Sequence, residues 1–246
     1  MVERKIYQGV LNIVRFNWHF YFIGLMLIFL LIIISPMIPF GDQKPLIYFA
    51  IIVVGFFSLS LAISFHIYDL SDLYELRWLK ASKHDKILNI NAGFDEILPL
   101  LELKVKDSNI TSCDFYNEER HNEISIKRAR KAFPLSENSI QVNTDQLPFP
   151  KTEFDVIILF LSAHEIRNES ERINFFIELS RVLKPDGKVY VTEHLRDGYN
   201  FLAYNIGFFH FHSRATWLNC FKHADLQILD ELKSTPFVTK FILSKV

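Results

Sequence analysis

Two long apolar stretches dominate the start of the chain. Residues 16–41 and 46–68 contain no Asp, Glu, Lys or Arg, and each exceeds the roughly 20 apolar residues that cross a bilayer core. A signal peptide would be shorter, would end in a small-residue cleavage site and would not be followed at once by a second stretch. The pattern predicts a transmembrane helical hairpin over residues 1–68, with spans at about 18–40 and 46–68 joined by a turn at 39–45.

The flanks of this hairpin carry its positive charge. Basic residues precede the first stretch and follow the second, namely Arg4, Lys5 and Arg15, then Arg77, Lys80, Lys83 and Lys86. Because basic flanks stay in the cytoplasm, we expect both ends there, with the protein in the cytoplasmic (inner) membrane and the lipid bilayer as its partner. His19 and His66, near the span ends, are interpreted as interfacial anchors, with substrate capture as the alternative.

The segment 69–86 is polar but has apolar residues at helical spacing, namely Leu70, Leu73, Leu76, Trp78 and Leu79. This periodicity predicts an amphipathic linker helix on the membrane surface, capped by Asp69 or Ser71. An ordinary helix of the following domain is the alternative.

From residue 87 to 246, short apolar runs alternate with helical patterns. Strands are predicted at 87–90, 109–113, 139–142, 154–161 and 188–192, and helices at 96–105, 118–133 and 169–183, the last ended by a turn at 184–187. Two more strands are predicted at 226–232 and 237–244. The alternation indicates an α/β fold with a mostly parallel sheet and helices on both faces, and the last two strands would add a terminal antiparallel pair.

Polar residues follow each parallel strand, where ligands bind in such folds. They are Asn89 to Asp95, Asp114, Asn143 to Asp145, Ser162 to Ile166 and Glu193 to Asp197. The net charge of −1 gives no argument for nucleic-acid binding. Cys113 and Cys220 match no disulfide framework or metal-ligand spacing, so no metal is expected.

Three stretches around the fourth and fifth predicted strands are distinctive. They are LPFP at 147–150, FDVIILFLSAHEI at 154–166 and FFIELSRVLKPDGKVYVTEH at 175–194. In these the chain resembles the class I S-adenosylmethionine-dependent methyltransferases, over about residues 86–246. The resemblance implies a Rossmann-like methyltransferase fold with S-adenosylmethionine as cofactor.

Eight residues are candidates for cofactor binding: Asn89, Asn91, Gly93, Asp95, Asp114, Asn143, Thr144 and Ser162. By the resemblance, Asp114 falls on the acid that accepts both ribose hydroxyls, and Asn143 falls where an acid usually meets the adenine amino group. Asn89 and Asn91 stand where the family has an acid and its first glycine. The favoured hypothesis is an altered but working cofactor loop. A loop that binds the cofactor without methyl transfer, and a structural relic, are the alternatives.

Methyl transfer needs an aligned acceptor and, for some acceptors, a base. The base candidates are two His/Glu pairs at strand ends, His164 with Glu165 and Glu193 with His194. The aromatic segment 196–214 is expected to build a substrate pocket, with a buried core helix as the alternative. Its candidate substrate-binding residues are Tyr199, Asn200, Tyr204, His210 and His212.

The sequence therefore predicts a membrane-anchored methyltransferase acting on a hydrophobic, lipid-like or aromatic acceptor. The hairpin motivates this acceptor class, because a water-soluble substrate needs no two-span anchor. A scaffold that kept the fold and lost catalysis is one alternative, and a nicotinamide-dependent reductase on a similar fold is another. The acceptor atom and the oligomeric state are left open.

Overall fold

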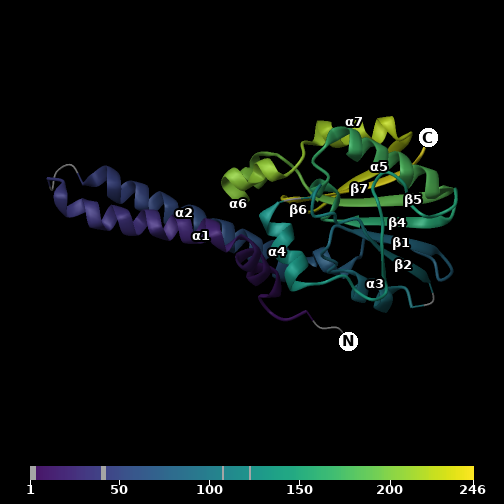
Figure 1. Cartoon of the computed structure of the whole chain (residues 1–246), viewed down its shortest axis with the longest axis horizontal. Coiled ribbons are helices and arrows are strands. Elements are labelled where there is room, and N and C mark those ends of the chain that lie inside the picture. The colour runs from purple at the N-terminus through teal and green to yellow at the C-terminus, as the bar shows by residue number, and fades with distance from the viewer. Residues whose placement is uncertain (1–3, 40–42, 107, 122) are drawn as a thin grey trace.

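A helical hairpin projects from an α/β domain (Figure 1). The computed structural model describes residues 4–39, 43–106, 108–121 and 123–246. Helix α1 spans Gln8–Ile34, a 3-10 turn follows at Ser35–Met37, and α2 spans Lys44–Phe65. Both helices are long and apolar enough to cross a membrane, and only 6% and 0% of their apolar windows are buried. The predicted turn includes residues 40–42, which lie outside the described residues.

The two helices of the hairpin touch at Gly24. A Cβ added there would lie 2.0 Å from a ring carbon of Phe57 on α2, so a larger residue would force the helices apart. Beside this contact the rings of Tyr21 and Phe57 pack with their centroids 5.3 Å apart. At Gly55, also on α2, an added Cβ would meet nothing within 4 Å. Gly24 is therefore a packing position, whereas Gly55 faces open space.

The described part of the domain is built on a seven-stranded sheet. Its strands are β1 Lys86–Asn91, β2 Asn109–Asp114, β3 Ser139–Gln141, β4 Phe154–Phe160, β5 Leu183–His194, β6 Leu226–Thr235 and β7 Val238–Lys245. Their order is β3-β2-β1-β4-β5-β7-β6. Strands β1 to β5 are parallel, and β7 runs antiparallel to both of its neighbours, β5 and β6. The predicted mostly parallel sheet with a terminal antiparallel pair is confirmed.

Helices cover both faces of this sheet (Figure 1). On one face lie α5 Glu169–Val182 and α7 Arg214–His223, which bury Phe176, Trp217 and Phe221 in the core. On the other face lies α3 Leu98–Lys104. Helix α4 Ile124–Ala132, shorter than the predicted 118–133, and α6 Gly198–Tyr204 lie near the base of the hairpin. The predicted turn at 184–187 lies within β5, where its pairing with β4 shifts register.

The segment 69–86 is not the predicted amphipathic helix. A π-helical turn at His66–Leu70 and a 3-10 turn at Asp72–Glu75 are followed by residues without helix or strand up to β1. Leu76 has a positive φ of 52 degrees, which a continuous helix does not allow. The apolar side chains of the segment are buried with α3 against the sheet, namely Leu73, Leu76, Trp78 and Leu79. The leucine spacing reflects burial in the domain rather than contact with a membrane surface.

Asp69 joins the end of the α2 segment to the start of α1. Its carboxylate accepts hydrogen bonds from the backbone N–H groups of Gly9 and Val10, at 2.7 and 2.8 Å. The first N–H groups of a helix have no partner within the helix, and an acid there also suits the positive end of its dipole. Asp69 therefore caps the N-terminus of α1 and not, as predicted, a helix in segment 69–86. Ser71 caps only the short 3-10 turn that follows it.

Candidate active site

The loop after β1 is held closed by its own side chains. Asp95 accepts from the amide of Asn89 at 2.6 Å and from that of Asn91 at 3.4 Å, and it caps α3 through two backbone N–H groups at 3.0 Å. Burial raises the pKa of Asp95, against the lowering effect of these hydrogen bonds. Asn91 accepts from the N–H of Gly93 at 3.0 Å, and Gly93 has a φ of +88 degrees. The asparagines thus fix a loop whose turn depends on glycine.

Asp114, the expected ribose-binding acid, lies almost fully buried at the carboxyl end of β2. One carboxylate oxygen accepts from the Tyr116 N–H at 2.7 Å, and the other pairs with the Arg130 guanidinium at 2.6 Å. Burial raises the pKa of Asp114, while Arg130 acts in the opposite direction. A ribose at this carboxylate would share it with Arg130 or displace it. The basic end of α4 was visible in the sequence, but its contact with Asp114 was not.

The remaining expected cofactor residues lie along the same edge of the sheet. Ser162, after β4, is buried and donates to a backbone carbonyl of β1 at 3.2 Å. Thr144 is buried and donates to a carboxylate on α5 at 2.6 Å, whereas Asn143 is exposed. Because β3, β2, β1 and β4 are adjacent in that order, these residues follow one another along the edge with the β1 loop and Asp114.

The base of the hairpin lies against this edge. The ring of Phe16 on α1 meets that of Phe94 in the β1 loop, with centroids 5.5 Å apart. Arg128 on α4 donates to the Phe16 carbonyl at 2.7 Å and lies 2.7 Å from His19 Nδ1. His19, interpreted above as an interfacial anchor, thus contacts the domain. Helix α4 connects the hairpin to Asp114, because it carries both Arg128, which contacts α1, and Arg130, which pairs with Asp114.

The closest contact among the four expected catalytic residues joins His164 to Glu193, which are not neighbours in the sequence. His164 Nδ1 lies 2.6 Å from the buried Glu193 carboxylate, which also accepts the His164 backbone N–H at 3.2 Å. Glu193 and His194 are consecutive on β5, so their side chains leave opposite faces of the sheet. The predicted Glu193–His194 pair is therefore wrong, and a His164–Glu193 dyad replaces it. Such a dyad fixes the imidazole and leaves Nε2 available to accept a proton.

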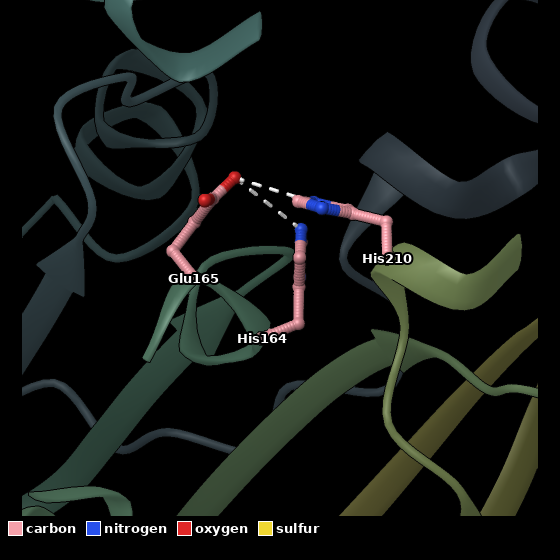
Figure 2. A group of neighbouring side chains, drawn as sticks. All are labelled: His164, Glu165 and His210. Carbon is pink, nitrogen blue, oxygen red and sulfur yellow. Dashed lines mark ion pairs between the residues drawn. The ribbon is translucent and has the colours of Figure 1, made fainter. Parts of the chain in front are cut away.

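Glu165 joins His164 to His210, as Figure 2 shows. Its Oε1 lies 3.6 Å from His164 Nε2 and 3.5 Å from His210 Nε2, and the two rings pack edge to face with centroids 4.8 Å apart. His210 Nδ1 lies 3.6 Å from Glu123. Burial opposes the charged form of His210, but Glu123 and Glu165 stabilise it and raise its pKa to about 9. Burial likewise opposes the charge on Glu165, yet the two histidines hold its pKa below the usual value.

His194 belongs to a separate network that includes the hairpin. Its Nδ1 lies 2.9 Å from the Phe237 carbonyl, its Nε2 lies 2.7 Å from the Tyr68 hydroxyl, and Tyr204 lies 3.1 Å from that hydroxyl. Burial lowers the pKa of His194 to about 4, so the ring is neutral near pH 7. Because a carbonyl only accepts, Nδ1 donates and Nε2 accepts from Tyr68. Sequence reasoning missed Tyr68, since its partner lies 126 positions away.

A cavity of about 620 Å³ lies between the base of the hairpin and the domain. Its polar end is lined by five of the candidate residues, His164, Glu165, His194, Tyr204 and His210. Its apolar end runs between α1 and α2, along Ile23, Leu27, Val53 and Phe57. The volume suits a small-molecule ligand, and the lining joins the carboxyl edge of the sheet to the interior of the hairpin.

Three expected substrate-binding residues, Tyr199, Asn200 and His212, do not line this cavity and contact other parts of the domain instead. Tyr199 is exposed and packs on the Phe237 ring. Asn200 is buried and donates to Asp197 and to a backbone carbonyl. His212 lies 3.1 Å from the Arg172 guanidinium, and burial lowers its pKa to about 3. Only part of the aromatic segment therefore faces the cavity.

Residues 88–191 match the protein family described as "Methyltransferase domain". Over these residues the chain is similar to methyltransferase domains. The crystal structure of an S-adenosylmethionine-dependent methyltransferase from Aquifex aeolicus has the same fold, with a TM-score of 0.54 and 17% sequence identity over 72% of this chain and 91% of that chain. The family match and the shared fold imply S-adenosylmethionine as the cofactor.

The residues of the sheet edge fit that cofactor. Asp114 offers a buried carboxylate at the end of β2, and Gly93 has no side chain where a Cβ would lie 3.0 Å from Tyr116. Ala92 and Ser162, at the same edge of the sheet, also line the cavity. When bound, the cofactor supplies an electrophilic methyl group. The chain's own residues would hold its ribose and present the acceptor from the cavity.

The curated relatives match shorter stretches of the chain. An uncharacterized methyltransferase of Schizosaccharomyces pombe is 34% identical over 89 residues, which are 36% of this chain and 29% of the relative. A ubiquinone/menaquinone biosynthesis C-methyltransferase, UbiE, of Shewanella sediminis is 27% identical over 108 residues, or 44% of this chain and 42% of the relative. Its namesake in Erwinia tasmaniensis is 41% identical over 56 residues, or 23% and 21%. The chain thus spans less than half the length of these relatives.

Proposed function

We propose that the chain is a membrane-anchored S-adenosylmethionine-dependent methyltransferase that acts on a hydrophobic, lipid-like or aromatic acceptor. The observation that carries this proposal is the cavity, which begins at the His/Glu cluster and continues between α1 and α2. The two candidate spans have mean hydropathies of 2.5 and 2.6. With both helices in a bilayer, the apolar end of the cavity lies at the depth of the acyl chains. The basic flanks of the hairpin support a domain on the cytoplasmic side of the inner membrane.

The shape of the cavity supports an acceptor with a polar or flat head and an apolar tail. The head would meet His164, Glu165 and His210, and the tail would follow Leu27 and Val53. Two relatives described above are named as ubiquinone/menaquinone biosynthesis C-methyltransferases. An isoprenoid quinone combines a flat ring with an apolar chain. A quinol ring with one methyl group fewer and an isoprenoid tail is therefore the first acceptor to test.

Cofactor binding is tested by titration calorimetry of S-adenosylmethionine and S-adenosylhomocysteine into the full chain in lipid nanodiscs. We expect micromolar binding that Asp114→Asn weakens by about 30- to 100-fold, because hydrogen bonds to a charged acceptor contribute about 1.5–3 kcal/mol each. Asp145→Asn is the matched control, since Asp145 is an exposed acid paired with Arg120 at 2.9 Å. A folded wild-type chain that binds neither compound would refute the proposal.

The route of the acceptor is tested by transfer of a tritiated methyl group into material that partitions into organic solvent. Leu27 lines the cavity, whereas Leu30 on the same helix is half exposed and lies outside the lining. Leu27→Trp should raise the KM for a tailed acceptor at least tenfold and leave cofactor binding unchanged, and Leu30→Trp should change neither. Equal effects of the two substitutions would contradict entry between the helices.

A second candidate function is a protein that binds the cofactor, or only keeps the fold, without methyl transfer. The observation that favours it is the loop after β1, where Asp95 satisfies both asparagines, together with the Arg130 pair on Asp114. The calorimetry separates the cases. Binding without transfer to any lipid fraction supports a non-methylating cofactor-binding protein, and absence of binding supports a membrane scaffold.

A further inference from the structure

We propose that His164, Glu165 and His210 form a binding site for a divalent transition-metal ion of the zinc or iron(II) type. One ligand atom from each residue lies within 4.8 Å of the other two. Glu165 Oε1 is 3.6 Å from His164 Nε2 and 3.5 Å from His210 Nε2. Ligands at about 2.0–2.1 Å from a four-coordinate ion are separated by roughly 3.4 Å, so two of the three separations are already close to this value.

The donor set is the one that such ions use in open sites. Two imidazoles and one carboxylate hold catalytic zinc and non-haem iron while leaving positions free for water or substrate. In Figure 2 both rings turn their Nε2 sides toward the Glu165 carboxylate. The cluster also lines the cavity. The remaining coordination positions would therefore face the space in which the acceptor is proposed to bind.

Each histidine has a carboxylate behind it. His164 Nδ1 lies 2.6 Å from Glu193, and His210 Nδ1 lies 3.6 Å from Glu123. Metal-bound histidines usually donate their second N–H to a carboxylate or carbonyl, which fixes the tautomer and orients the lone pair of the other nitrogen toward the ion. With Nδ1 of each ring on the side of its carboxylate, Nε2 of both rings lies on the side of Glu165, where an ion would replace the proton of His210.

The buried charge of the cluster also indicates a cation. Glu165 is only 5% exposed, and its Oε2 has no hydrogen-bond partner among the described residues. Glu193 is fully buried. Burying carboxylates without enough matching charge is costly, and the three carboxylates Glu123, Glu165 and Glu193 are matched only in part, by the charged form of His210 and by Arg167, 4.0 Å from Glu123. A divalent ion between the two rings would balance Glu165 and Glu193 and complete the coordination of the free oxygen.

This inference deepens the proposed function and rests on it for the role of the ion. An acceptor hydroxyl bound at a free position would lose its proton to water more readily, because a metal ion lowers the pKa of oxygen ligands. The ion would also hold the resulting oxyanion at the polar end of the cavity, in a fixed orientation toward the cofactor edge.

The test uses the untagged full chain in nanodiscs, stripped with a chelator and titrated with Zn²⁺ or Co²⁺. The readouts are the metal content per chain after desalting and the visible absorption of bound Co²⁺. We expect about one ion per chain in the wild type and in His84→Ala, which removes an exposed histidine outside the cluster. Glu165→Gln and His210→Gln should each reduce the content at least tenfold. Glu193→Gln should weaken binding about 10- to 100-fold.

A wild-type chain that retains no ion, or cluster variants that retain as much as the wild type, would overturn the site. Cofactor binding and thermal unfolding are measured on every variant. Glu165 and His210 come from different elements. If one of the two variants fails to fold, the metal content of the other variant tests the site. Stoichiometric metal without any cofactor binding would refute the methyltransferase proposal and leave the metal site standing.

Discussion

Replacing Asp69 with Ala should open the base of the hairpin. The carboxylate accepts from the N–H groups of Gly9 and Val10 at 2.7 and 2.8 Å. Hydrogen bonds to a charged group contribute about 1.5–3 kcal/mol each, but both N–H groups lie at a helix end that water can reach once it opens. The net cost is therefore that of a lost helix cap, about 2 kcal/mol. This corresponds to a roughly 30-fold larger population of the opened first turn.

Hydrogen–deuterium exchange of the nanodisc-embedded chain measures this population directly. Peptides that cover the first turn of α1 should exchange about 30-fold faster in Asp69→Ala. Asp72→Ala is the matched control, because Asp72 is an exposed acid three positions further on. Gly9 also lines the cavity, so the acceptor KM should rise in the first variant alone. Unchanged exchange in Asp69→Ala, or equal acceleration in both variants, would refute the role of Asp69 as a clamp.

Three further predictions follow from the glycine contacts and from one buried histidine. Gly24→Ala should lower the thermal unfolding temperature in detergent, because overpacking costs about 1–3 kcal/mol; Gly55→Ala, where the new Cβ meets nothing within 4 Å, should not. Gly93→Ala should weaken cofactor binding by about 5- to 30-fold in calorimetry, since φ is +88 degrees there and a left-handed residue costs about 1–2 kcal/mol. Gly198→Ala, with open space around it, is the control. The pKa of His194 is about 4 when folded, below the ordinary 6.5. The unfolded chain therefore binds the proton first, and stability present above pH 6.5 is lost as pH falls toward 4. Urea midpoints measured against pH should show this loss, and His194→Gln should reduce it; a wild-type profile that is flat in this range would contradict the assignment.

The sheet could be predicted from the sequence because each strand has a local signal in its own run of apolar residues. The run 154–161 is continuously apolar, as expected for a strand buried on both faces, and it forms β4 at the centre of the sheet. The carboxyl ends of parallel strands meet at one edge. For this reason strand order alone brought Asp114, Ser162 and His164 to the same side of the domain.

The linker and the composition of the cavity could not be predicted, because both depend on contacts between distant segments. The leucine spacing of 69–86 fits a helix equally well, and only the open face of the sheet makes burial of Trp78 and Leu79 favourable. The contacts of Tyr68 with His194 and of His210 with Glu165 likewise join residues from separate elements. Residue type marked the histidines as candidates, but their partners were set by tertiary structure.

The cavity wall has a consequence for how the protein is made. Arg128 reaches Phe16 across 112 positions, and His194 reaches Tyr68 across 126. At a synthesis rate of about 5–20 residues per second, roughly 6–25 s separate the emergence of Tyr68 from that of His194. With the hairpin inserted as proposed, the cavity wall formed by α1 and α2 is already in the bilayer during this interval, before the rest of the cavity has been synthesised. The pocket is thus completed late in translation, and a nascent chain that stops before β5 has an anchor without a site.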